Sequence, residues 1–80
     1  MKAELFHRIA EPGSAEMRRL VGALGLFPSV RFRNVAFPEA AGDLQRHGGG
    51  VTPALWDGEQ LHTGTARVAA RLRALHRPEG

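Results

Sequence analysis

The chain has 80 residues, no cysteine, and 11 lysine and arginine side chains against 8 aspartates and glutamates, for a net charge of +3. A chain of this length builds one small domain, here residues 1–80. Without cysteine it has no disulfide, no thiolate metal site and no cysteine nucleophile. No apolar run approaches the about 20 residues of a membrane helix. We therefore expect a soluble, cytoplasmic domain, whose modest charge gives weak support for a polyanionic partner.

The first third of the chain predicts a strand followed by a helix. Residues 3–8 mix leucine and phenylalanine with charged neighbours, as in a short strand, and the Glu-Pro-Gly sequence at 11–13 ends it. From Ser14 on, four apolar residues fall at helical spacing: Met17, Leu20, Val21 and Leu24. Gly13 is expected to be the N-cap of this helix, and Gly25 the left-handed residue that closes it.

The middle of the chain predicts a second strand and a second helix. Residues 29–35 alternate apolar side chains with arginines, which indicates a half-buried strand. Pro38 suits the first turn of a helix that runs to about residue 47, with Ala41 and Leu44 facing inward. The three glycines at 48–50 end that helix.

The last third predicts a hairpin and a third helix. Residues 51–56 form a short apolar strand, and Asp57-Gly58 indicates a two-residue turn into a strand at 60–62. Thr63 or Thr65 is expected to cap the final helix. The apolar stripe of that helix is Val68, Leu72 and Leu75, and Pro78 ends it.

The predicted order is therefore β-α-β-α-β-β-α, an α/β fold with three helices. The first two strands are joined by a helical crossover, so we expect them to be parallel, whereas the hairpin adds an antiparallel edge. The result is a four-stranded mixed sheet with helices on both faces.

Three motifs in this order resemble the thioredoxin superfamily, most closely the glutaredoxins and the N-terminal domains of glutathione transferases. Residues 11–17, Glu-Pro-Gly-Ser-Ala-Glu-Met, are similar to the glutaredoxin segment Pro-Gly-Cys-x-x-Cys, and Val51-Thr52-Pro53 is similar to the family's cis-proline tract. Residues 54–58, Ala-Leu-Trp-Asp-Gly, followed by Leu61, look like the transferase pattern Pro-Ala-Leu, Asp-Gly, Leu. The resemblance covers nearly the whole chain and implies a thioredoxin-like fold with a cis peptide bond before Pro53.

This resemblance places Ser14 and Met17 where the two redox cysteines would stand. A serine hydroxyl stays protonated at neutral pH and a thioether has no proton to lose, so the chain cannot perform thiol–disulfide exchange. The resemblance also implies a groove between the start of the first helix and the proline turn. Its candidate binding residues are Pro12, Gly13, Ser14, Met17, Thr52, Pro53, Thr63 and Thr65.

We therefore expect a non-catalytic domain that docks a protein or peptide partner in this groove, with no cofactor, metal or membrane. The alternative is residual glutathione binding, with the Ser14 hydroxyl near the thiol, as in some transferases. The transferases hold the glutamyl end of glutathione with an acidic residue, which residues 62–65 lack. Ser14 also fits a plain role at the start of the helix, and the Pro53 turn fits either docking or architecture.

The arginines and the aromatic residues give weaker indications. Arg31 and Arg33 share a strand face, and Arg67 and Arg71 share a helix face, but a single-strand nucleic-acid reader would interleave such charges with exposed aromatics. Solvated faces are the favoured interpretation, and nucleic-acid binding is the third alternative. Trp56 is expected to pack against the sheet. The four histidines show no metal-ligand spacing: His7, His47, His62 and His76.

Overall fold

A four-stranded mixed sheet forms the middle layer of the protein in a computed structural model, of which residues 2–76 are described. The strands are β1 (Ala3–His7), β2 (Val30–Asn34), β3 (Ala54–Trp56) and β4 (Leu61–Thr63). Their order across the sheet is β2-β1-β3-β4, with β1 parallel to β2 and antiparallel to β3, and β3 antiparallel to β4. The predicted α/β class, element order and mixed sheet are confirmed.

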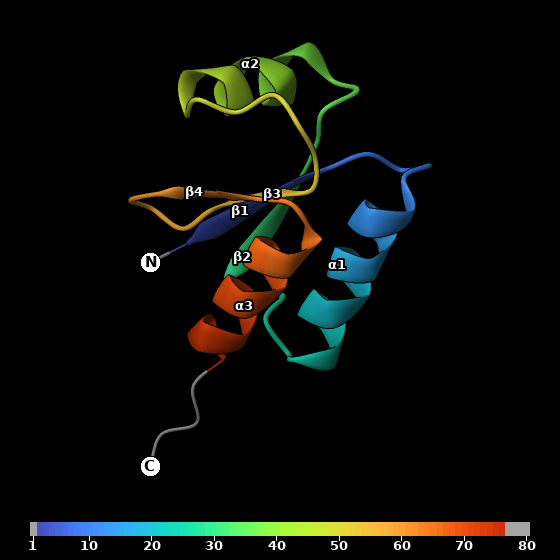
Figure 1. Cartoon of the computed structure of the whole chain (residues 1–80), viewed down its shortest axis with the longest axis vertical. Helices are drawn as coiled ribbons and strands as arrows, with labels where there is room; N and C mark the ends of the chain where they lie inside the picture. Colours follow the sequence, from blue (N-terminus) through green and yellow to red (C-terminus); the bar gives the residue numbers. More distant parts are fainter. Residues whose placement is uncertain (1, 77–80) are drawn as a thin grey trace.

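Three helices cover the two faces of the sheet (Figure 1). They are α1 (Pro12–Ala23), α2 (Pro38–Arg46) and α3 (Thr65–Leu75). Helices α1 and α3 lie side by side on one face, whereas α2 lies on the other. In the described part of the chain, none of these helices has the length and apolar character needed to cross a bilayer.

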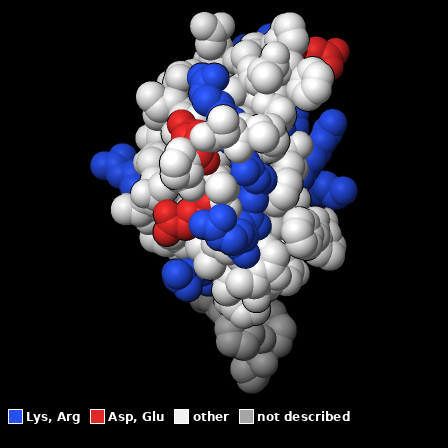
Figure 2. Space-filling model, turned by 90° about the vertical axis from the view of Figure 1, so that its right-hand side faces the viewer, with Lys and Arg blue, Asp and Glu red and all other residues white. Residues whose placement is uncertain are grey.

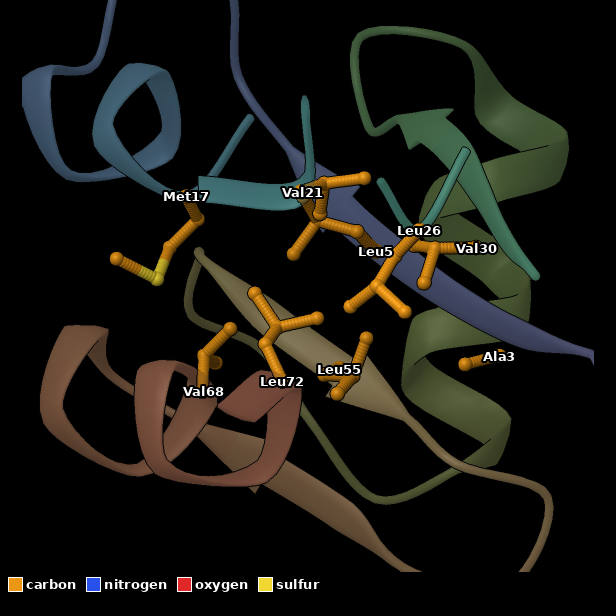
Figure 3. Packing of buried hydrophobic residues seen from close by; sticks show 9 residues of the cluster. All are labelled: Ala3, Leu5, Met17, Val21, Leu26, Val30, Leu55, Val68 and Leu72. Atoms are coloured by element: carbon orange, nitrogen blue, oxygen red, sulfur yellow. The ribbon is translucent and has the colours of Figure 1, made fainter. Parts of the chain in front are cut away.

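The main core lies between the sheet and the pair α1 and α3. Met17 and Val21 reach in from α1, and Val68 and Leu72 from α3 (Figure 3). The buried members of the cluster are Ala3, Leu5, Met17, Val21, Leu26, Val30, Leu55, Val68 and Leu72. Burying these side chains is the main force that holds the three elements together, because the chain has no covalent crosslink.

A smaller core lies beneath α2. Its buried residues are Phe6, Val35, Leu44 and Ala54, and three half-buried side chains pack around them: Ala41, Trp56 and Leu61. The inward orientation predicted for Ala41 and Leu44 is therefore correct. Trp56 packs as expected, with its ring stacked on the imidazole of His47 at 3.8 Å between centroids.

The sequence predicted the C-terminal end of α1 correctly, but not its N-terminal end. The helix begins at Pro12, two residues before the predicted start, and its N-cap is Glu11 rather than Gly13. A proline is well suited to the first helical position because its missing N–H needs no partner there. At the other end Gly25 adopts φ +67°, and the N–H groups of Gly25 and Leu26 donate to Gly22 O (3.1 Å) and Val21 O (3.0 Å). Gly25 therefore closes the helix in the left-handed conformation, as predicted.

Three predicted boundaries in the last third were wrong. Strand β3 begins at Ala54, and Val51 lies outside it with 60% of its surface exposed. The hairpin connection is four residues long, 57–60, because the Asp57 side chain accepts from the amides at 59 and 60 and holds a wider turn. The N-cap of α3 is Gly64, at φ +86°, rather than either neighbouring threonine. Arg77 and Pro78 lie outside the described residues.

Candidate functional site

Glu11 joins the start of α1 to the proline turn. One oxygen of its carboxylate, Oε1, accepts a hydrogen bond from the Ser14 hydroxyl and a second, of 2.8 Å, from the Thr52 hydroxyl. The Ser14 oxygen in turn accepts from the backbone N–H of Arg8 at 3.1 Å. These bonds connect the residue that follows β1, the start of α1 and the segment before β3, although Glu11 and Thr52 lie 41 positions apart in the sequence.

The start of α1 also packs directly on the proline turn and on α3. A Cβ added to Gly13 would lie 3.0 Å from Thr65 Cγ2 and 3.4 Å from Pro53 Cδ. The peptide bond between Thr52 and Pro53 is cis, and Pro53 O accepts from the Gly64 N–H at 3.0 Å. The structure thus brings the first motif, the proline turn and the start of α3 together.

The candidate residues differ sharply in exposure. Ser14 is fully buried, Met17 is 2% exposed within the main core, and Pro53 is also buried. Gly13, Thr52 and Thr63 are half-buried, while Pro12 and Thr65 are exposed. The prediction that Ser14 and Met17 line an open groove is therefore wrong, because the apolar thioether has joined the core and the hydroxyl has partners inside the protein.

The hydrogen bonds of Ser14 limit its chemistry. A hydroxyl has a single proton, and this one is donated to the Glu11 carboxylate. Stabilising a ligand thiolate requires a donor, so that role would cost the protein an internal bond to a carboxylate. Glu11 itself places a negative charge at the N-terminus of α1, where the helix dipole favours an anion.

Arg18 fixes the loop that follows β1. Its guanidinium donates to Arg8 O at 3.2 Å, to Ile9 O at 3.3 Å and to the Nδ1 of His7 at 2.9 Å. Since a guanidinium can only donate, His7 Nδ1 accepts, and the imidazole carries its proton on Nε2. Burial and the Arg18 charge lower the pKa of His7, in keeping with this neutral form.

Three large apolar side chains are exposed at the same end of the sheet: Ile9 at 65%, Phe37 at 65% and Val51 at 60%. Ile9 follows β1 and Phe37 follows β2, and these strands are parallel, while Val51 precedes the antiparallel β3. Figure 1 accordingly shows the three connections on the same side of the sheet. We call these three residues the apolar rim.

A hollow of about 380 Å³ lies at the same end of the sheet, against α2, Gly49 and Gly50. Arg8, Val35, Pro38, Ala41, Gly42, Leu44, Gln45, Gly49 and Gly50 line it. Each rim residue is a close sequence neighbour of a lining residue: Ile9 follows Arg8, Phe37 precedes Pro38, and Val51 follows Gly50. Figure 2 looks onto this end of the molecule, where basic side chains gather in the middle of the face, flanked by acidic ones and by uncharged surface.

No family model, curated protein or solved structure matches the chain. Its function must therefore be argued from its own side chains. Among the described residues, no three His, Cys, Asp or Glu side chains are placed to hold a metal ion.

In each of the two arginine pairs predicted from the sequence, one arginine forms an ion pair and the other is exposed. Arg33 pairs with Glu4 and, at 2.6 Å, with Asp43, whereas Arg31 is exposed. Arg71 contacts Asp57 at 3.0 Å, whereas Arg67 is exposed. Each face keeps one exposed arginine of the two, which weakens the case for a continuous nucleic-acid track.

Sequence reasoning missed Glu11, Arg8 and the apolar rim. An acidic residue directly before a proline that starts a helix is a signal that could have identified Glu11 as the cap. The rim and the hollow had no such signal, because they depend on how three separate connections meet in space.

Proposed function

We propose that the chain is a non-catalytic interaction module of thioredoxin-like architecture, and that it binds an extended segment of a partner protein across the apolar rim. The resemblance of its three motifs to the thioredoxin superfamily supports the architecture. The chemistry supports the absence of catalysis, because the two cysteine positions of that family hold Ser14, whose proton is engaged, and Met17, which is a core residue.

The single observation that carries the proposal is where the exposed apolar side chains lie. Ile9, Phe37 and Val51 are three of the four large apolar residues with high exposure among the described residues. Their three connections lie at one end of the sheet, and each is the sequence neighbour of a residue that lines the hollow. Apolar exposure at one end of a fold, next to a hollow, is typical of binding sites. A hollow takes up the side chains of an extended segment, whereas self-association of two flat faces would leave it unfilled.

The experiment is a selection of peptides from a displayed random library, followed by affinity measurements on two matched variants. Phe37→Ser removes a rim residue that is also the N-cap of α2, and serine is a better cap, so this variant stays folded. Phe27→Ser removes an equally large side chain, 60% exposed, that precedes β2 and so lies at the opposite end of the sheet.

Phe37→Ser should lower the affinity for the selected peptides at least tenfold, since burying an aromatic side chain contributes about 1.5–3 kcal/mol. Phe27→Ser should change the affinity less than twofold, because its side chain lies at the opposite end of the sheet. Equal losses for the two phenylalanine variants would disprove binding at the rim.

A further inference from the structure

The hollow beneath α2 combines an apolar wall with a single charged group. Val35, Ala41 and Leu44 provide the wall, and Arg8 is the only charged residue among those that line it. No acidic side chain of the described residues forms an ion pair with the Arg8 guanidinium. The hollow therefore favours a ligand that carries both an aliphatic group and a negative charge.

The main chain of Arg8 is held firmly although its side chain is exposed. Its N–H donates to Ser14 Oγ at 3.1 Å, and its carbonyl accepts from the Arg18 guanidinium at 3.2 Å. The base of the side chain is thus fixed by neighbours that do not use its charge. The guanidinium itself is exposed, and its paired N–H groups can donate to a carboxylate in a strong and directional contact.

Gly49 and Gly50 add lining without side chains to the hollow. A Cβ on Gly49 would lie 2.5 Å from Leu61 Cδ2 and 2.8 Å from Leu44 Cδ1, so this part of the wall packs closely on the small core. A Cβ on Gly50 would meet nothing within 4 Å, so its backbone borders open space. A peptide main chain can approach such a wall without meeting side chains.

We infer that this hollow receives the free carboxyl terminus of a partner chain whose last residue is aliphatic. In an extended chain successive side chains point to opposite sides, so an internal leucine and an adjacent glutamate cannot enter one hollow together. The side chain and the α-carboxylate of a terminal residue are attached to the same carbon, so both can enter one hollow together. The volume of about 380 Å³ lies at the small end for ligand sites, which suits one residue.

This inference rests on the proposed function, because the rim would hold the residues that precede the terminus. The test therefore separates the two. The probes are a blocked tetrapeptide that ends in leucine with a free carboxylate, the same peptide as a C-terminal amide, and 4-methylpentanoate as a free aliphatic acid. Binding to the full chain is followed by amide chemical shifts.

The free acid peptide should shift the amides of Gly42, Gly49 and Gly50, and the amidated peptide should bind at least tenfold more weakly. Arg8→Gln should reduce the affinity for the acid at least tenfold and leave that for the amide unchanged. The matched control is Arg73→Gln, which removes an exposed positive charge from the last turn of α3, and it should change either affinity less than twofold.

Three outcomes would overturn the inference. If acid and amide bind equally while Phe37→Ser weakens both, the rim binds peptides but the terminal carboxylate is not recognised. If 4-methylpentanoate binds as tightly as the acid peptide, the hollow is a site for small acids. If neither these peptides nor library-selected ones bind at this end, the proposed function fails as well.

Discussion

Replacing Asp57 with asparagine tests how the hairpin is attached to α3. The Asp57 carboxylate is 4% exposed and accepts from the amides of Glu59 and Gln60 at 2.8 Å each. It also contacts His62 Nε2 at 2.8 Å and Arg71 Nε at 3.0 Å, the latter an ionic contact and not an aligned hydrogen bond. Three hydrogen-bond partners and one cation thus converge on two carboxylate oxygens, whereas asparagine has only one side-chain oxygen and no charge.

The expected loss follows from these contacts. Removing one partner of a buried ion pair costs about 3–5 kcal/mol, and a hydrogen bond to a charged group contributes about 1.5–3 kcal/mol. The Arg71 side chain is 35% exposed and recovers part of its hydration, so the lower range applies. We expect Asp57→Asn to lower the free energy of unfolding by about 2–3 kcal/mol, which for a domain of this size is roughly 10–20 °C in Tm.

The pH dependence gives a second, independent readout. Burial by itself raises the pKa of Asp57, but its bonds to Gln60, His62 and Glu59 and the charge of Arg71 outweigh burial and hold the pKa well below its usual range. A carboxyl group with a lowered pKa in the folded state stabilises the protein above its unfolded pKa of about 4 and loses that contribution as pH falls. The difference in free energy of unfolding between the wild type and Asp57→Asn should therefore shrink by up to about 1.4 kcal/mol per pH unit below pH 4.

Urea unfolding at pH 7 and at pH 3 measures both effects, with Glu59→Gln as the control. Glu59 is exposed on the same turn, so its loss removes a negative charge without removing a buried acceptor, and it should change stability by less than about 0.5 kcal/mol. A loss below about 0.5 kcal/mol for Asp57→Asn at pH 7, or an equal difference in stability at pH 7 and pH 3, would show that the buried carboxylate does not hold the hairpin to α3.

Two further predictions use other parts of the fold. Burial and the Arg18 charge lower the pKa of His7, so the unfolded chain takes up this proton first. The urea midpoint of the wild type should therefore fall more between pH 7 and pH 5 than that of His7→Gln, and parallel curves would contradict this. A Cβ on Gly42 would meet only a side-chain nitrogen at 3.7 Å, so Gly42→Ala should stabilise α2 by about 0.5–1 kcal/mol. Gly49→Ala should instead cost about 1–3 kcal/mol, because its Cβ would lie 2.8 Å from Leu44 Cδ1. Thermal melts of the two alanine variants test both predictions. Changes in Tm of the same sign would show that local packing does not control the stability effect at these positions.

The element order could be predicted because each element has a strong local signal. The apolar spacing from Met17 to Leu24 indicated a helix, and Gly25 could be assigned to its end because it is the residue that adopts positive φ without a steric cost. The boundaries were weaker where a side chain overrides the local pattern. Asp57 is the clearest example, since its bonds to two amides hold a four-residue connection where the Asp-Gly pair suggested two.

The sequence predicted which segments meet at the start of α1, but not how the side chains there are used. The motifs brought Gly13 and Pro53 together correctly, because the order of the elements fixes which loops meet at one end of the sheet. The burial of Ser14 and the use of its proton by Glu11 could not be inferred, since they depend on distances between side chains of different segments. For the same reason the sequence could not show that Arg33 forms an ion pair while Arg31 stays exposed.

The start of α1 and the proline turn are held together by polar groups of the protein itself, which is one reason for proposing a binding surface further out. A carboxylate at the start of α1 is bonded to hydroxyls from two segments, so Glu11, Ser14 and Thr52 satisfy one another. Groups that are satisfied internally gain little from a ligand, because binding would exchange one set of hydrogen bonds for another. Exposed apolar side chains and an unpaired arginine gain the most when a ligand covers them. This difference is the physical reason why the proposed ligand is placed on the apolar rim and at Arg8.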